Sequence, residues 1–408
     1  MAEAAAQFQK GLDQLALLPD TLDRQRQELE FYSALGAVYQ VLIATAAREA
    51  GYAYGRAREL WERLGSPPEF FQALYGQSRH HRFRGEFDLA QRLAEDLLRL
   101  GNERNAPDAL VLGHDASGGN LMFVGQFAAS RSHLEGALAL SHHVSHDLLV
   151  PDAEFHPHVH SLAYLGISLF CLGFPAHAAE QCNAARAESR RLAHLPSFAV
   201  SLAIGARLLS LLGDYTTLNE WTDQLVTVAA ERGFRSWSAM TRIYRGWVTV
   251  KNGDVTEGMS LLRRGLDAFC ATGTKVLIPY YTALLAAACE IAGQDEEAVT
   301  LLDDALRMVD GTGEGWFAAE LYRHKGQLLR QGHAAAAEEL YCKALSIARD
   351  QEAKLWELRA AASLARLWRD HGRRPEAREV LAPVYGWFTE GFDTPDLKDA
   401  KTLLNELV

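Results

Sequence analysis

The sequence has few cysteines, and none is spaced for a metal site or a local disulfide. Five cysteines are spread over 408 residues, at positions 171, 182, 270, 289 and 342. Their number is odd, and no two have the Cys-x-x-Cys spacing of zinc or redox motifs. We therefore expect free thiols, most of them buried, in the reducing environment of the cytoplasm.

Features that would indicate a membrane or nucleic-acid-binding protein are also missing. The N-terminus lacks the apolar block of a signal peptide, and apolar stretches such as Ile278 to Cys289 are shorter than the ~20 residues that span a bilayer. The 41 Lys+Arg are outnumbered by 52 Asp+Glu, so the net charge is −11 and no global positive field attracts nucleic acid. We expect a cytoplasmic protein that binds neither nucleic acid nor a membrane.

Sequence motifs of nucleotide and hydrolase chemistry are absent as well. There is no GxxxxGK[ST], GxSxG or HExxH sequence. The glycine-rich run from Asp310 to Trp316 follows a helical pattern, whereas a phosphate-binding loop follows a strand. We predict that the chain is not an enzyme, needs no cofactor and does not turn over ATP.

The sequence does contain a glycine that recurs at nearly constant intervals. The steps between these glycines are 40, 48, 40, 40, 40, 39 and 40 residues, and the positions are Gly85, Gly125, Gly173, Gly213, Gly253, Gly293, Gly332 and Gly372. A fixed period of 20–50 residues indicates a solenoid or a propeller. Amphipathic helical spacing on both sides of each glycine, without strand-like alternation, favours a helical solenoid with glycine at the turns.

Small residues recur at two fixed distances from these glycines. Seven of the eight positions that lie seven residues earlier are small, as at Ser78 and Gly246, and so are seven of the eight that lie five residues later, as at Ala90 and Gly258. Such positions allow two antiparallel helices to approach closely. The pattern resembles the tetratricopeptide repeat, although the period is 40 instead of 34 residues, so we expect helices of about 15–18 residues.

The fold that we predict is an all-α, right-handed superhelical solenoid of about nine helix pairs. Residues 66–394 would form the tetratricopeptide-like repeats, and residues 23–65 a less regular first helix pair. Residues 1–22 are typical of the second helix of a repeat whose first helix is missing, and residues 395–408 of a C-terminal capping helix. The missing helix favours a domain cut from a longer protein; a shortened relative that caps itself differently is the alternative.

Three segments carry a more specific resemblance, namely residues 113–140, 237–266 and 354–404. They resemble the C-terminal tetratricopeptide region of bacterial multidomain signalling ATPases and class III adenylate and guanylate cyclases. In that family the array follows a cyclase or kinase-like domain and an AAA-type ATPase domain, and neither is present in this sequence. The resemblance implies a sensor or scaffold module without catalytic activity.

The single 48-residue step comes from a histidine-rich insertion at residues 141–160. His142, His143, His146, His156 and His158 are weak candidates for Zn²⁺, Ni²⁺ or Cu²⁺ ligands. Their HxH spacing suits an extended loop instead of one helix face. We expect an ordinary exposed loop without metal, and the alternatives are a metal site or a pH-sensitive interaction loop.

The concave groove is the better candidate for a binding site. In tetratricopeptide arrays the first helix of each pair lines this groove. Carried over by offset from each glycine, the family's groove positions select ten residues that we expect to bind a ligand or partner: Arg79, Arg82, Asp115, His160, Arg207, Trp247, Tyr280, Tyr322, Arg359 and Arg366. Their arginines predict a locally positive surface for an acidic or phosphorylated partner, unless carboxylates of neighbouring helices neutralise them.

The function that we predict is binding of a protein, a peptide or a small effector in this groove, with occupancy reported to an attached catalytic domain through a shift in superhelix pitch. One alternative is a self-assembly module that forms homo-oligomers and binds no ligand. A less favoured alternative is an enzyme or metal-binding protein that uses the histidine-rich insertion.

Overall fold

The computed structural model describes residues 2–67, 70–144, 155–232 and 234–407, and over these residues it contains helices and no strands. The N-terminal helices are α1 (Ala2–Leu15), α2 (Leu22–Leu42), α3 (Arg48–Arg63), α4 (Phe71–Phe83), α5 (Phe87–Arg104), α6 (Pro107–Phe123), α7 (Phe127–Ser141), α9 (Pro157–Leu172), α10 (Pro175–Arg191) and α11 (Leu195–Leu212). They are followed by α12 (Tyr215–Arg232), α13 (Arg235–Lys251), α14 (Val255–Cys270), α15 (Ile278–Ile291), α16 (Asp295–Thr312), α17 (Ala318–Leu329), α18 (Ala334–Asp350), α19 (Lys354–Asp370), α20 (Arg374–Tyr385) and α21 (Pro395–Glu406). The all-α prediction is confirmed.

The recurring glycines form the turns between the two helices of each pair. Seven of the eight have positive φ, between 72° at Gly85 and 100° at Gly253. Glycine is favoured there because it adopts this left-handed conformation without the strain that a Cβ atom introduces. The exception is Gly332, whose φ is not positive. It stands at the end of the single 39-residue step.

The two sets of small residues contact each other within each helix pair. The Ser78 hydroxyl donates to the Ala90 carbonyl at 2.7 Å, and a Cβ added to Gly246 would stand 2.8 Å from the carbonyl oxygen of Gly258. Ser130 donates in the same way to the Gly118 carbonyl at 2.7 Å. A larger side chain at either position would separate the two helices, which explains why the sequence keeps both positions small.

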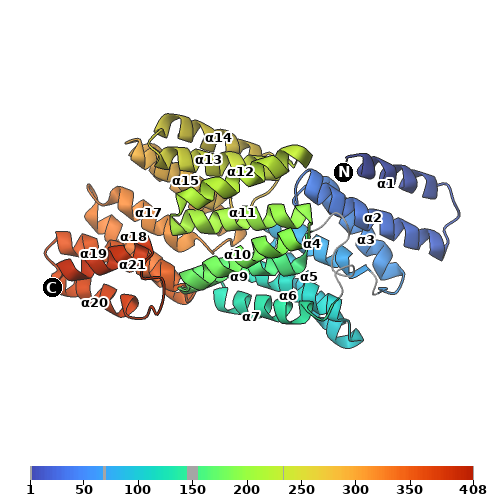
Figure 1. Cartoon of the computed structure of the whole chain (residues 1–408), viewed down its shortest axis with the longest axis horizontal. Coiled ribbons are helices and arrows are strands. Elements are labelled where there is room, and N and C mark those ends of the chain that lie inside the picture. The colour runs from blue at the N-terminus through green and yellow to red at the C-terminus, as the bar shows by residue number, and fades with distance from the viewer. Residues whose placement is uncertain (1, 68–69, 145–154, 233, 408) are drawn as a thin grey trace.

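The superhelix closes on itself, so later repeats pack on the ends of earlier ones. The backbone N–H of Lys275 donates to the Phe83 carbonyl at 2.9 Å, and that of Trp316 donates to the Phe123 carbonyl at 3.1 Å. Both acceptors are the last residues of helices, where carbonyls lack a partner within the helix. Segments about 190 residues apart in sequence are therefore neighbours, and α9 also contacts α19 (Figure 1).

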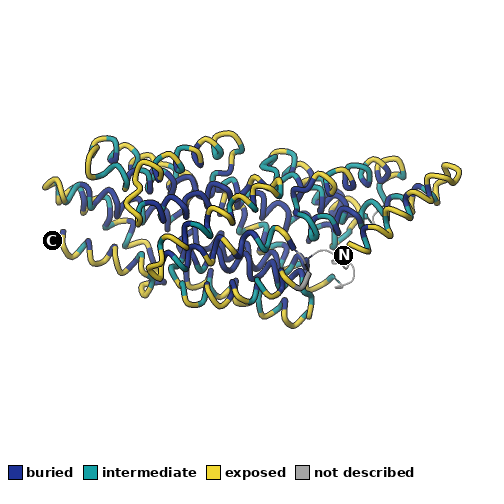
Figure 2. Tube along the Cα trace, turned by 90° about the horizontal axis from the view of Figure 1, so that it is seen from above, coloured by how far each residue is buried: buried dark blue, intermediate teal, exposed yellow. Residues whose placement is uncertain are grey.

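This closure fills the superhelix axis with side chains. Buried residues run through the middle of the elongated molecule, and exposed residues dominate its tapered ends (Figure 2). One apolar cluster extends from Phe87 to Leu407. Of the described helices, α11 alone is long and apolar enough to cross a membrane, but 78% of it is buried inside the protein, as expected for a core helix.

Candidate functional site

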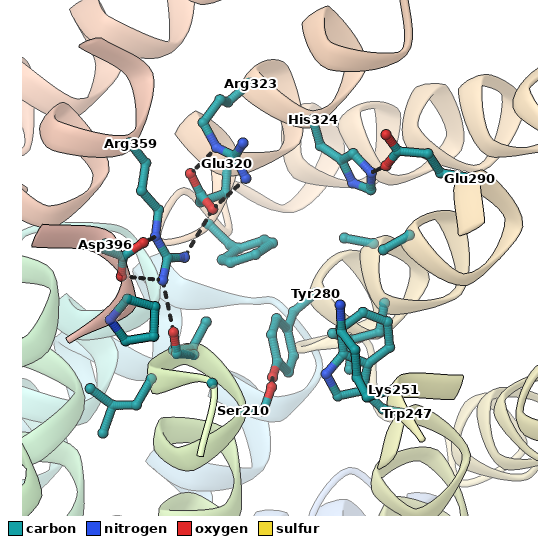
Figure 3. A pocket seen from close by; sticks show the side chains of 18 of the residues that line it. Ser210, Trp247, Lys251, Tyr280, Glu290, Glu320, Arg323, His324, Arg359 and Asp396 are labelled. Atoms are coloured by element: carbon teal, nitrogen blue, oxygen red, sulfur yellow. Dashed lines mark hydrogen bonds and ion pairs between the residues drawn. The ribbon is translucent and has the colours of Figure 1, made fainter. Parts of the chain in front are cut away.

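A large open hollow lies on the inner side of the second half of the superhelix. Its volume is about 740 Å³, within the usual range for ligand pockets. The walls come from α11, α13, α15, α17 and α19, and the N-terminus of α21 forms one edge (Figure 3). We call this hollow the α11–α21 pocket.

Aromatic rings form the floor of the α11–α21 pocket. Tyr280 is fully buried, and its hydroxyl shares a 2.6 Å hydrogen bond with the hydroxyl of Ser210 on α11. The Phe317 ring packs edge to face on Tyr280, at 5.1 Å between centroids. Trp247 is only 6% exposed, and its indole N–H has no hydrogen-bond partner in the described part of the chain. The floor thus offers apolar contact area and one unused donor.

An arginine network closes one side of the pocket and joins four helices. Arg359 on α19 forms a two-pronged ion pair with Asp396 on α21, with both N···O distances at 2.8 Å. Its Nη1 also donates to Glu320 on α17 at 3.1 Å, and its Nη2 to the Leu211 carbonyl on α11 at 2.7 Å. Because four of the five N–H donors of the guanidinium are bonded within the protein, Arg359 acts here as a structural clamp.

Glu320 is held ionised by two arginines. Arg323 donates to both of its carboxylate oxygens, at 2.6 and 3.1 Å, and Arg359 adds a third contact. Burial by itself would raise the pKa of the Glu320 carboxyl, but Arg323 and Arg359 outweigh burial and lower that pKa to about 2. Its negative charge is therefore permanent at physiological pH and already compensated.

Glu290 is compensated in the same way on the opposite wall. His324 Nε2 contacts one of its carboxylate oxygens at 2.9 Å, and the Gln327 amide donates to the other at 2.8 Å. The hydrogen bond to His324 is the main reason why the pKa of Glu290 is lowered. This carboxylate too has its partners within the protein.

Lys251 differs from the other charged groups of the pocket, because none of the described residues forms an ion pair with it. Its ammonium nitrogen lies 4.5 Å from the centroid of the Trp247 ring and 5.6 Å from that of Tyr215. Burial lowers the pKa of Lys251, and Glu290 partly opposes this effect. Lys251 thus presents an unpaired cation beside the unused indole N–H.

Three of the ten predicted groove residues line the α11–α21 pocket: Trp247, Tyr280 and Arg359. Arg366 lies in a smaller neighbouring hollow, where it forms an ion pair with Asp399. Tyr322 lies outside both hollows and packs against the core. The charges of Arg359 and Arg366 are neutralised by carboxylates of neighbouring helices. This is the alternative to a locally positive groove that the sequence left open. The α11–α21 pocket itself is lined by three fixed cations and three carboxylates.

The other five predicted residues are buried, because the second turn of the superhelix covers the inner face of the first. Exposed fractions are 2% for Arg79, 0% for Arg82 and Asp115, and 1% for His160 and Arg207. They form part of the interior instead of an open groove.

Asp115 is the centre of a buried hydrogen-bond network. It accepts from the Tyr75 and Ser161 hydroxyls, both at 2.6 Å, and from His160 Nδ1 at 2.8 Å. Burial would raise the pKa of Asp115, but His160 and these hydrogen bonds lower it overall. Burial also lowers the pKa of His160 to about 4, so that its ring is neutral and donates through Nδ1. The network joins α4, α6 and α9.

Sequence reasoning missed Glu320, Arg323 and Gln327, and the reason is the 39-residue step. The groove offset of ten residues, taken from Gly332, selects Tyr322. Counted from residue 333, which preserves the 40-residue period, the same offsets of thirteen, ten and six select the three residues that line the pocket. In the structure, Gly332 lacks the positive φ of the other seven recurring glycines, which agrees with a shift of the repeat by one residue at this point.

The histidine-rich insertion is only partly described. His146 lies outside the described residues, whereas His142 and His143 are exposed. His158 Nδ1 contacts the Ser141 hydroxyl at 2.6 Å, and the side chain of His156 caps the start of α9. Within the described ranges, no group of three or more His, Cys, Asp or Glu side chains is arranged to hold a metal ion.

Comparisons with known proteins support the fold. No family model matches this chain. An uncharacterized protein, R02095, of Rhizobium meliloti (strain 1021) is 27% identical over 209 residues, which are 50% of this chain and 20% of that protein. The match therefore spans about a fifth of the length of the relative.

Similar solved structures cover most of the chain. A Rap protein complexed with competence and sporulation factor has a TM-score of 0.62 at 11% identity and covers 95% of this chain and 100% of its own. The Rap conjugation gene regulator of plasmid pLS20, in complex with the Phr* peptide, has a TM-score of 0.54 at 11% identity, with coverage of 92% and 96%. At such identities the likeness shows the fold, a tetratricopeptide-like helical solenoid.

Proposed function

We propose that this chain is a non-catalytic binding module that holds a peptide or a protein segment with a carboxylate in the α11–α21 pocket. The observation that carries the proposal is the pairing of Lys251 with Trp247. The two side chains offer an unpaired cation and an unused N–H donor next to apolar rings, while the carboxylates of the pocket are already bonded.

A carboxylate fits these groups better than a cation does. The pocket's carboxylates Glu290, Glu320 and Asp396 all have arginine, histidine or amide partners, so a cationic ligand would have to break existing ion pairs. A carboxylate ligand would instead gain the Lys251 ammonium and the Trp247 N–H without displacing any partner. The preference for acidic partners thus has its physical basis in Lys251 and not in the arginines.

Peptide and protein ligands are favoured over metabolites by the shape of the site and by its fold relatives. The pocket is open to solvent and lies on the inner surface of a solenoid, where extended segments bind. Two of the similar structures are complexes with competence and sporulation factor and with the Phr* peptide.

The position of the module in a signalling ATPase or cyclase is the finer part of the proposal. The matched segment fills only a fifth of the Rhizobium relative, which fits a repeat array that belongs to a much longer chain. A ligand that prefers one superhelix pitch would bias whatever domain is attached. Because Asp396 of α21 is part of the pocket edge, occupancy acts directly on the docking of the C-terminal helix.

Selection from a random peptide library on the immobilised protein tests the proposal. We expect the selected peptides to be rich in Asp and Glu or to depend on a free C-terminal carboxylate. Trp247→Ala should weaken the best peptide at least about tenfold, the equivalent of ~1.4 kcal/mol and typical of a buried aromatic anchor.

Two lysine variants separate the role of the pocket cation from general charge. Lys251→Met should abolish the preference for acidic peptides and reduce the salt dependence of binding. Lys10→Met, at an exposed position on α1, removes the same charge far from the pocket and should leave binding unchanged. If Trp247→Ala and Lys251→Met select the same peptides as the parent with equal affinity, the ligand does not bind in the α11–α21 pocket.

A further inference from the structure

Two arginines of α10 meet at one neutral acceptor on α12. Arg186 and Arg190 stand one helical turn apart, and the Nη2 atoms of both donate to the side-chain oxygen of Gln224, at 3.1 and 3.0 Å. The amide nitrogen of Gln224 donates to the Glu220 carbonyl at 3.3 Å, which defines the orientation of the amide. Two guanidinium groups are therefore held side by side at a single oxygen atom. We call Arg186 and Arg190 the α10–α12 arginine pair.

No carboxylate of the described residues forms an ion pair with this arginine pair. The acidic residues that are close in sequence have other partners. Glu188 accepts from Nε and Nη2 of Arg191, at 2.8 and 2.7 Å, and Asp223 accepts from Arg245 at 2.7 Å. Because the amide oxygen of Gln224 carries no net charge, both positive charges of the pair lack a bonded counter-charge.

The arrangement is electrostatically unfavourable as it stands. Like charges one turn apart destabilise a helix. Burial lowers the pKa of Arg186, the charge of Arg190 lowers it further, and Glu220 on α12 partly opposes both effects. The Nε atom of Arg186 is also buried without a hydrogen-bond partner in the described part of the chain. An anion that bridges the two guanidinium groups would relieve their repulsion.

Aromatic rings hold both guanidinium groups in place. The guanidinium carbon of Arg186 lies 4.8 Å from the centroid of the Trp221 ring on α12, and that of Arg190 lies 5.2 Å from the Phe198 ring on α11. Stacking on a ring orients a guanidinium and leaves its in-plane N–H donors available. Each guanidinium has five such donors and uses one of them on Gln224. The pair therefore offers a preorganised set of donors to an anion.

We propose that the α10–α12 arginine pair binds a phosphate monoester. Such a group carries about two negative charges at pH 7 and three strong acceptor oxygens, so it can accept from both guanidinium groups at once. A carboxylate carries one charge, and its two oxygens match a single guanidinium. Gln224 keeps the two groups together without supplying a competing charge. This site shares no residue with the α11–α21 pocket and does not depend on the function proposed for that pocket.

A phosphorus NMR titration with the full chain tests the proposal, with sodium chloride keeping the ionic strength constant. The probes are inorganic phosphate and a short peptide with one phosphoserine, and sodium acetate is the competitor. We expect saturable broadening of the phosphate signal that acetate does not reverse. Both possible sources of the group support the site. Tighter binding of the peptide than of inorganic phosphate identifies a phosphorylated segment, and equal or weaker binding identifies a small phosphate compound.

The sharpest variant is Gln224→Glu, which places a carboxylate of the same shape between the two arginines. It should abolish phosphate binding and leave Tm equal to or above that of the parent, since the new ion pairs compensate the same charges. Arg190→Gln removes the exposed guanidinium of the pair and should weaken binding about tenfold. Glu220→Gln removes a nearby negative charge and should strengthen binding several-fold.

Two controls show whether the effects are local. Arg378→Gln, at an exposed position on α20, removes the same charge elsewhere and should keep the parent affinity. Lys251→Met in the α11–α21 pocket should keep it as well, so that the two sites succeed or fail independently. Absence of saturable binding by either probe, parent affinity in both Gln224→Glu and Arg190→Gln, or loss of binding in Lys251→Met would overturn the proposal.

Discussion

Replacing Arg359 with methionine should destabilise the closed superhelix, because this one guanidinium joins α11, α17, α19 and α21. Methionine keeps an apolar stem of similar length but loses the guanidinium, with its bonds to Asp396, Glu320 and the Leu211 carbonyl. It also loses the approach of the guanidinium carbon to the rings of Trp356 and Phe170, at 5.1 and 5.7 Å. The variant therefore isolates the contribution of the charged group from that of packing.

The expected magnitude follows from the burial of the partners. The pKa of Glu320 falls from an ordinary 4.5 to about 2, and this difference corresponds to about 3 kcal/mol of stability supplied jointly by Arg323 and Arg359. Asp396 is 21% exposed in its side chain, which places its ion pair between exposed and fully buried pairs. We expect Arg359→Met to cost roughly 2–3 kcal/mol, between the ~0–1 of surface pairs and the ~3–5 of broken buried pairs.

The pH dependence provides a second test of the same argument. Because the folded-state pKa of Glu320 is depressed, its stabilisation is present above pH 4.5 and is lost as the pH falls towards 2. With only Arg323 left, that pKa should rise. The stability difference between the parent and Arg359→Met should then shrink as the pH decreases from 5 to 3.

Urea unfolding followed by circular dichroism at several pH values measures both effects. Hydrogen exchange should also show early loss of protection at α21 and at the end of α11, the two elements that Arg359 holds together. Arg366→Met is the control, since its ion pair with Asp399 is more exposed and should contribute less than about 1 kcal/mol. Equal losses in the two variants, or a difference independent of pH, would refute the reasoning.

Four further variants test the packing of the helices and the charge of a buried carboxyl. Gly119→Ala should cost about 1–3 kcal/mol in urea unfolding, because its Cβ would overlap the buried Arg82 Nη1; Gly55→Ala on α3, which meets no atom within 4 Å, should instead stabilise by about 0.5–1 kcal/mol. Gly258→Trp should separate its helix pair and unfold the array locally, and a melting temperature equal to that of the parent would show that the repeat pairing is wrong. Glu314→Gln should raise Tm at pH 8 but not at pH 4.5, because burial raises the pKa of this carboxyl to about 7 and the fold loses stability as the pH rises between those values.

The local architecture was predictable because it depends on short-range spacing. Ser78 and Ala90, or Gly246 and Gly258, stand twelve residues apart across a turn, and the contact between them requires only two helices and one glycine. Such contacts recur in every unit and leave a repeated pattern in the sequence. The helix pairs, their turns and their close-packed positions were therefore accessible without a structure.

The closure of the superhelix was not predictable in this way. The bond from the Lys275 N–H to the Phe83 carbonyl joins segments 192 residues apart. It forms only if the small rotations between successive repeats add up to a full turn. The sequence of a single repeat does not determine this total rotation. The burial of Arg79, Arg82 and Arg207 depends on it and was missed for the same reason.

The same groove offset thus gives arginines with different physical roles along one chain. Arg207 and Arg366 both lie six residues before the glycine of their repeat. Arg207 belongs to the first turn, which the second turn covers, and it is a buried cation among aromatic rings. Arg366 belongs to the end of the array, where only α21 follows, and it forms an ion pair with Asp399 in a partly exposed hollow. The position of a repeat relative to the closure decides whether its inner residues become core, clamp or binding surface. A periodic sequence read one unit at a time does not contain this information.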